Sequence, residues 1–232
     1  MRNLSVLLFA CLTTAVFAQN IQLHYDFTDD RDYLTTTVEM FKPDAYGSTF
    51  FFIDFNYDVD EVEGVSESYF EIARAIKISE DVPFDLHVEY NGGQGQFFTP
   101  EGNVAYTISD AYLIGIEKTF LSEDFSRGIT FQAMYKYVRA IEQDSFQLTV
   151  VWFMNLMDGK ITFNGFADFW GEDVDYDFDG EIDDDVTFLA EPQIWYNLTE
   201  NWAVGSEVEF GYNFALTEGW DVFPTVAVKA TF

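Results

Sequence analysis

Carboxylates, rings and basic groups recur at every second position of many segments, and this spacing is the first clue to chemistry. In residues 84–91, His87 and Glu89 alternate with Leu86 and Val88. Successive side chains of a strand point to opposite faces. Each such segment therefore presents an apolar face and a polar face on which rings can stack against a planar base and carboxylates can accept hydrogen bonds from hydroxyl groups.

The candidate solute-binding residues on these polar faces combine acids, rings and a few bases. They are Glu39, Phe50, Phe52, Asp54, Glu71, His87, Glu89, Lys136, Phe166, Asp168, Trp170, Glu191, Trp195, Glu207 and Lys229. The same groups could instead form a salt-bridged interior without a ligand, as small barrels often do. We interpret the set as a solute path, because rings that face a wet lumen have few other uses.

Catalytic arrangements receive little support from the sequence. His24 and His87 are the only histidines, and no G-x-S-x-G motif occurs. A hydrolase of that type needs a nucleophile held beside a general base. We therefore expect no enzymatic activity.

One acidic segment resembles the opening of a calcium-binding loop. Asp175, Asp177 and Asp179 alternate and are followed by Gly180, and oxygen ligands in this pattern can wrap Ca²⁺. The twelfth position is Val186 rather than the glutamate of a complete loop. The segment is either a weak calcium site or a solvated acidic loop, and we expect no obligatory cofactor.

Charge and composition restrict the possible partners. Formal net charge is −30 at pH 7, which excludes a basic footprint for nucleic acid. Aromatic residues make up 19% of the chain, as expected where rings face lipid or form girdles at its two interfaces.

The alternating segments predict an all-β fold of about twelve strands, an even number that suits a transmembrane antiparallel β-barrel. Short connections alternate with longer acidic ones, as short periplasmic turns alternate with external loops. Residues 92–102 form a predicted glycine-rich loop, and Arg74 falls on the lipid side, where a bulge or an interfacial position would accommodate it. The expected strands are residues 21–27, 34–41, 49–57, 66–77, 84–91, 106–117, 129–139, 146–156, 161–170, 187–196, 202–210 and 222–232.

The two ends of the sequence fit export to an outer membrane. Residues 1–18 combine Arg2, an apolar core and a small-residue site before Gln19, which predicts a cleaved signal peptide followed by one barrel domain over 19–232. Cys11 lies within that segment, so the mature chain would form no disulfide. Residues 222–232 alternate strictly and end on Phe232, like the closing strand of an outer-membrane barrel.

A soluble β-sandwich or lipocalin-like barrel is the alternative architecture. Such a soluble fold would bury the apolar face of each strand in a hydrophobic core. The many Phe and Trp residues of that face exceed what a small core can hold, which favours the membrane barrel.

Several runs resemble the nucleoside-specific channels of the outer membrane, the Tsx-like family, and their relatives. They are LTTTVEMFKPD (34–44), GSTFFF (47–52), EIAR (71–74), HVEYNGG (87–93), FQAMYKY (131–137), GFADFW (165–170) and EPQIWYN (191–197). The resemblance spans essentially the whole mature chain. It implies a twelve-stranded monomeric barrel whose narrow lumen passes nucleosides.

We conclude from the sequence that the chain is an outer-membrane β-barrel channel, porin-like, for passive uptake of small solutes, with nucleosides favoured by resemblance. Its expected partners are the lipid bilayer and small solutes, without nucleic acid, and we expect a monomer. The alternative is a non-conducting structural or surface-binding barrel whose acidic loops bind calcium.

Overall fold

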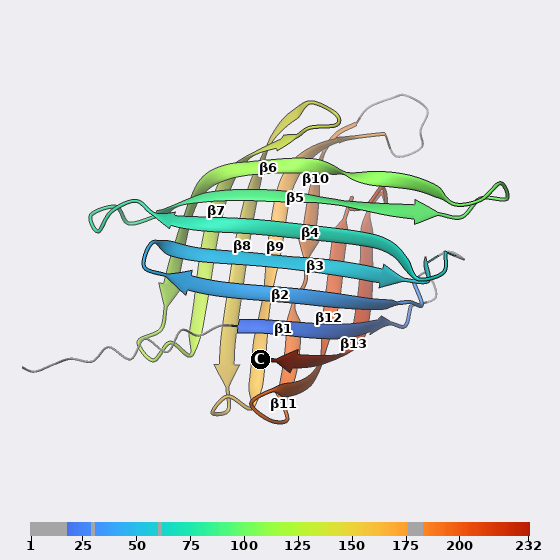
Figure 1. The fold of residues 1–232 in the computed structure, drawn as a ribbon. Coiled ribbons are helices and arrows are strands. Elements are labelled where there is room, and N and C mark those ends of the chain that lie inside the picture. The colour runs from blue at the N-terminus through green and yellow to red at the C-terminus, as the bar shows by residue number, and fades with distance from the viewer. Residues whose placement is uncertain (1–17, 29–30, 60–61, 176–182) are drawn as a thin grey trace, which may run out of the picture.

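The structure, a computed structural model, describes residues 18–28, 31–59, 62–175 and 183–232, and these fold into one closed antiparallel sheet (Figure 1). The predicted signal peptide lies almost wholly outside the described residues, and β1 begins at Ala18. No helix in the described part of the chain is long and apolar enough to cross a membrane.

The strands follow one another around the barrel in chain order. They are β1 (Ala18–Asp26), β2 (Leu34–Asp44), β3 (Gly47–Tyr57), β4 (Val65–Lys77), β5 (Asp85–Phe97), β6 (Val104–Leu121), β7 (Arg127–Val138), β8 (Gln143–Leu156), β9 (Ile161–Val174), β10 (Asp183–Ala190), β11 (Gln193–Asn197), β12 (Trp202–Tyr212) and β13 (Trp220–Thr231). β1 pairs with β13, which closes the ring and leaves no free edge.

β10 and β11 together form one stave of the wall, so the barrel has the twelve staves that the sequence predicts. Both pair with β9 on one side and with β12 on the other. Glu191 and Pro192 separate them, because proline has no N–H to donate to the ladder. The register is the same before and after this gap, so the alternation of side chains continues through it.

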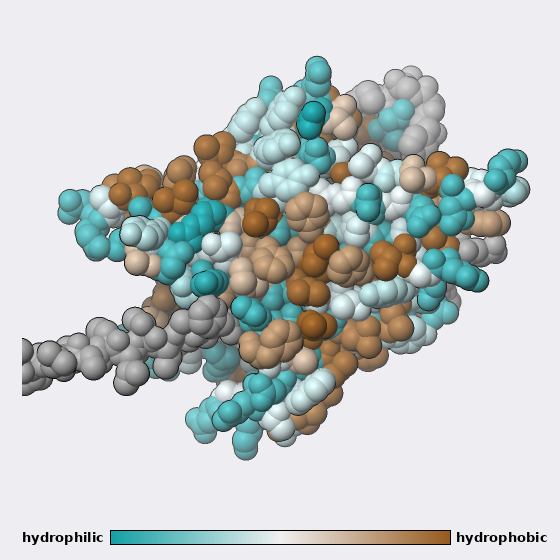
Figure 2. Space-filling model, in the orientation of Figure 1, coloured by the Kyte–Doolittle hydropathy of each residue, from teal (hydrophilic) through white to brown (hydrophobic). Residues whose placement is uncertain are grey.

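Alternation on β1 identifies the inside and the outside of the barrel. Ile21 and Leu23 are 42% and 41% exposed, whereas Gln22 and His24 are 1% and 3% exposed. The polar parity therefore faces the interior and the apolar parity faces outward. In Figure 2 hydrophobic residues spread over the strands, and hydrophilic residues gather toward their ends.

The connections at the two ends of the barrel differ. Residues 45–46, 122–126 and 157–160 make short turns at the end where β1 begins and β13 ends, although 78–84 is longer. The opposite end carries the connections after β1, β3, β5, β7, β9 and β12, and β5 and β6 extend beyond their neighbours there (Figure 1).

The predicted glycine-rich loop over 92–102 is wrong for its first half. Residues 92–97 continue β5 and pair with β6. A Cβ on Gly95 would lie 2.4 Å from the ring of Tyr106. The glycine thus leaves room for a tyrosine ring across the ladder, and the connection itself is only 98–103.

Arg74 faces outward near the end of β4, as one of the two sequence-based alternatives expected. It pairs with Thr49 and Val88 in regular ladders, so it does not lie in a bulge. Its guanidinium donates to both Asp44 carboxylate oxygens at 2.8 and 2.9 Å. The residue thus lies three positions from the end of β4, and its charge is paired.

Candidate functional site in the barrel interior

All the solute-binding candidates predicted from the sequence belong to the inward-facing parity. The ladders connect them in rows: Glu39 lies beside Phe52, and Phe52 lies beside Glu71. Asp168 is the cross-strand neighbour of Thr149, whose side chain is buried. The structure therefore brings the set into one interior.

Five carboxylates from both sides of the barrel form what we call the carboxylate belt. They are Asp54 on β3, Glu71 on β4, Asp168 on β9, Glu191 between β10 and β11, and Glu207 on β12. Glu71 interacts electrostatically with Asp168, and Glu191 interacts with Asp54 and Glu71. Because these pairs join staves about half the ring apart, the belt spans the interior.

Neutral neighbours hold most of the belt. The Tyr69 hydroxyl donates to Glu71 at 2.7 Å. Thr37 donates to Asp54, Thr149 to Asp168, and the Gln193 amide to Glu207. These uncharged donors fix the orientation of four of the five carboxyl groups, all but that of Glu191.

The two interior lysines lie on tryptophan rings. The Lys136 ammonium is 4.2 Å from the centroid of Trp170, and the Lys229 ammonium is 4.0 Å from that of Trp195. Such cation–π contacts favour a desolvated ammonium. Within the described residues, neither lysine has a carboxylate oxygen within the 4.0 Å of an ion pair.

His87 lies between two acids at the inner wall. Its Nε2 is 2.9 Å from Glu89 and its Nδ1 is 2.7 Å from Glu117. The imidazole is 2% exposed. A protonated ring would donate to both carboxylates, so this trio combines one cation with two anions in a buried place.

Arg31 reaches into the mouth of the barrel from the connection after β1. Its guanidinium contacts Glu209 at 2.5 and 3.1 Å and stacks 3.6 Å above the Phe223 ring. Burial lowers the pKa of Arg31, but the hydrogen bonds and charge of Glu209 outweigh this and raise it overall. Burial raises the pKa of the neighbouring Tyr33 to about 12. The connection is therefore attached to the inner wall.

Sequence reasoning concentrated on charges and rings and omitted many neutral interior groups. Strand alternation would have found them, because they share the parity of the residues chosen. Arg31 carries no such signal, since it lies outside the strands. The omitted groups include Asn20, Gln22, Thr37, Tyr69, Asn91, Leu113, Met134, Gln147, Thr149, Asn164, Thr187 and Gln193.

The proposed calcium ligands lie mostly outside the described residues. Asp175 ends the described part of that segment, and Asp177 and Asp179 lie outside the described residues. Elsewhere, the described residues contain no group of three or more His, Cys, Asp or Glu side chains that could hold a metal ion. Calcium binding at Asp175, Asp177 and Asp179 stays a prediction.

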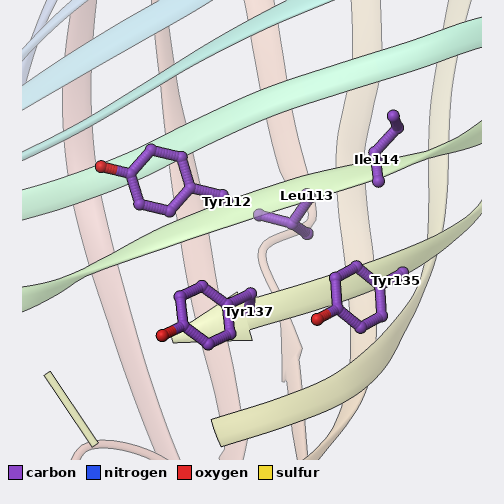
Figure 3. Close-up of a pocket in the computed structure, with 5 residues that line it drawn as sticks. All are labelled: Tyr112, Leu113, Ile114, Tyr135 and Tyr137. Carbon is purple, nitrogen blue, oxygen red and sulfur yellow. The ribbon is translucent and has the colours of Figure 1, made fainter. Parts of the chain in front are cut away.

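A shallow pocket of about 390 Å³ lies on the outer wall (Figure 3). Tyr112, Ile114, Tyr135 and Tyr137 line it with their outward-facing side chains, and Leu113 of the inward parity contributes at its floor. The pocket opens toward the lipid-facing side rather than the interior, so it is separate from the solute-binding candidates.

Comparisons with known proteins agree with this architecture. A family model described as "Domain of unknown function (DUF5020)" matches residues 18–232. No protein with a curated function matches the chain. A NanC porin structure is similar with a TM-score of 0.57 and 8% identity, over 93% of this chain and all 100% of that one.

A second solved structure is the outer membrane protein Omp33 of Acinetobacter baumannii. Its TM-score is 0.44 and its identity 16%, over 94% of this chain and 98% of that one. Because the NanC porin is only 8% identical to this chain, its similarity shows a shared barrel fold and no more.

Proposed function

The chain belongs to the DUF5020 family, and from this membership and the geometry of its interior we propose that it is an outer-membrane channel for passive passage of small solutes. The observation that carries the proposal is a closed ring whose outer face is mainly apolar and whose inner face holds most of the buried polar and charged side chains. Only a closed barrel satisfies all its backbone groups when strands cross lipid.

The outer wall supports a place in the membrane. Large apolar side chains stay exposed all around it, among them Ile72, Ile114, Leu148 and Val226 at 47%, 51%, 48% and 55%. In water, molecules with such an apolar surface would associate with one another. In a membrane, lipid tails would cover the surface. The end with the shorter turns would face the periplasm and the opposite end the exterior.

Nucleosides are the solutes that the interior suits best. A base could stack on Phe52, and ribose hydroxyls could donate to the carboxylate belt. Phe52 lies 6.0 Å from the rings of both Phe50 and Tyr69, so a row of rings is already present on β3 and β4. The resemblance to Tsx-like channels points to the same solutes.

Single-channel recording in planar lipid bilayers tests this proposal, with adenosine added against the ion current. Concentration-dependent block that weakens in Phe52→Leu, but not in the outward control Phe55→Leu, would support nucleoside passage. A current without block would retain the channel and reject nucleosides. A folded protein that carries no current would favour the non-conducting, surface-binding barrel.

A further inference from the structure

The interior contains more hydrogen-bond acceptors than donors. Within the described residues, five buried side-chain atoms have no hydrogen-bond partner. Four of them are oxygens of inward-facing residues, namely Asn91, Gln143, Asn164 and Asp26, of which the Asp26 oxygen lies 3.9 Å from the Arg31 guanidinium. The fifth is the Trp152 indole nitrogen, which belongs to the outward-facing parity. An unpaired buried oxygen is costly, so this imbalance indicates that a donor is missing from the interior.

Asn91 places one of these oxygens beside the carboxylate belt. It is 6% exposed and lies directly opposite Glu71 in the β4–β5 ladder. Directly opposed residues have Cβ atoms only about 5 Å apart. Asn91 Oδ1 accepts no hydrogen bond. Glu71 accepts one from the Tyr69 hydroxyl. The pair therefore offers acceptor oxygens to a group that supplies hydrogens or positive charge.

Glu191 adds a further acceptor from the opposite wall. Its carboxylate has no hydrogen-bonding side-chain partner among the described residues, and it interacts electrostatically with Asp54, Glu71 and Glu207. Gathered like charges repel, and the resulting negative potential attracts a counter-ion.

The interior lysines do not remove this negative field. Lys136 and Lys229 lie against tryptophan rings rather than in ion pairs. His87 is already shared by Glu89 and Glu117, and Glu89 itself interacts electrostatically with Glu71 and Asp168 of the belt. Arg31 forms an ion pair with Glu209 at the mouth of the barrel. Five carboxyl groups of the belt thus face only two lysines, Lys136 and Lys229, which interact with them at longer range than an ion pair.

We propose that the carboxylate belt and Asn91 form a cation-selective constriction, whose ligand class is a monovalent cation or the protonated amine of a small solute. Carboxylates and amide oxygens are acceptors that suit such groups, and rings of acidic side chains give cation preference in pores. Anions would be repelled at the same place. The inference rests on the proposed channel function and assigns its charge selectivity.

The test is the reversal potential of the purified full-length protein in planar bilayers under a KCl gradient. The wild type should prefer K⁺ over Cl⁻. Glu71→Gln and Glu191→Gln should each lower the permeability ratio by about fivefold, the factor expected for one unit charge acting at about 4 Å in water. Glutamine at 71 can still accept from Tyr69, and Glu191→Gln removes no hydrogen bond within the described residues, so both variants should fold.

The matched control is Glu123→Gln, which removes one charge from the short turn 122–126. It should leave the ratio unchanged. Asn91→Asp should raise the ratio, because it adds a carboxylate opposite Glu71. A wild-type current that is unselective or prefers Cl⁻, or an equal effect of Glu123→Gln, would overturn this inference alone. Absence of current from the folded protein would overturn the proposed channel as well.

Discussion

Single interior residues show how charge can be accommodated inside this barrel. Most carboxylates of the carboxylate belt accept a hydrogen bond from a neutral neighbour. His87 differs, because its two ring nitrogens lie 2.7 and 2.9 Å from carboxylate oxygens. His24 is similarly buried, but its hydrogen bonds go to the neutral groups of Gln22 and Thr225 at 2.9 and 3.1 Å, and its nearest carboxylate oxygen, on Glu207, is 3.8 Å away. The two histidines of the chain therefore have similar burial, but only His87 is hydrogen-bonded to carboxylates.

This contrast predicts different costs for the same substitution. His87→Leu leaves Glu89 and Glu117 buried beside each other, and we expect a loss of about 3–5 kcal/mol in the free energy of unfolding. His24→Leu removes neutral hydrogen bonds, and we expect about 1–3 kcal/mol. Urea titration of the protein refolded into lipid vesicles measures both. Equal losses would show that the His87 contacts are not ionic.

The sequence predicts the face of these residues but not their partners. Alternation places His87 and Glu89 on one polar face, because a strand repeats every second residue. Glu117 lies on a different strand, and its contact with His87 depends on the register of β5 against β6. Arg31 is harder still, since no periodicity governs a connection. Side-chain parity is thus local information, whereas the contacts are not.

Among the strands, the stave made of β10 and β11 depends on a close approach by β9. Gly165 has a φ of 152°, and a Cβ there would lie 2.4 Å from the Glu191 carbonyl oxygen. The backbone of β9 therefore touches the gap at Glu191 and Pro192. Only glycine combines that conformation with that space.

Gly165→Ala should consequently lower stability by more than Gly102→Ala. Gly102 also has a positive φ, 126°, but no atom lies within 4 Å of a Cβ at that position. We expect about 1–3 kcal/mol for Gly102→Ala from the backbone conformation alone, and a larger loss for Gly165→Ala. Urea titration in vesicles measures the difference. Similar losses would contradict the close approach.

Depth in the membrane distinguishes two outward positions on β4. Ile72 lies near the middle of the strand, whereas Arg74 is close to its end and pairs with Asp44. Ile72→Arg should cost about 2–4 kcal/mol, the range for a cation at the bilayer midplane. Arg74→Leu should change stability by less than about 1 kcal/mol. A small cost for Ile72→Arg in lipid vesicles would place β4 differently.

The strands themselves were the most predictable level of the fold. Each expected segment contains or overlaps an observed strand, since alternation is strong wherever one face is apolar and the other polar. The errors lie where glycine or proline misleads: residues 92–97 are strand despite three glycines, and Pro192 divides a stave without shifting its register. In the first case the space that Gly95 leaves for the Tyr106 ring decides the outcome, and in the second the missing N–H of proline does.

For the whole molecule, closure is the property that gives the alternation its meaning. Asn20 to Asp26 of β1 pair with Thr225 to Thr231 of β13, so the two ends of the barrel sequence meet in one ladder. The inner face then encloses the acids, rings and lysines, and the outer face is left to lipid. The number of staves followed from counting segments, but the way opposite walls meet at the carboxylate belt depends on the complete ring.

The central claim, that the ring encloses a path for small solutes, is tested most directly by liposome swelling. Purified protein is reconstituted into vesicles, its folding is checked by heat-dependent migration on a gel, and the vesicles are diluted into isotonic solutions of uncharged solutes of increasing size. Swelling should be fastest with the smallest solutes, should occur with nucleosides and should decline as solute size increases. Vesicles that contain folded protein but swell no faster than empty ones would contradict it.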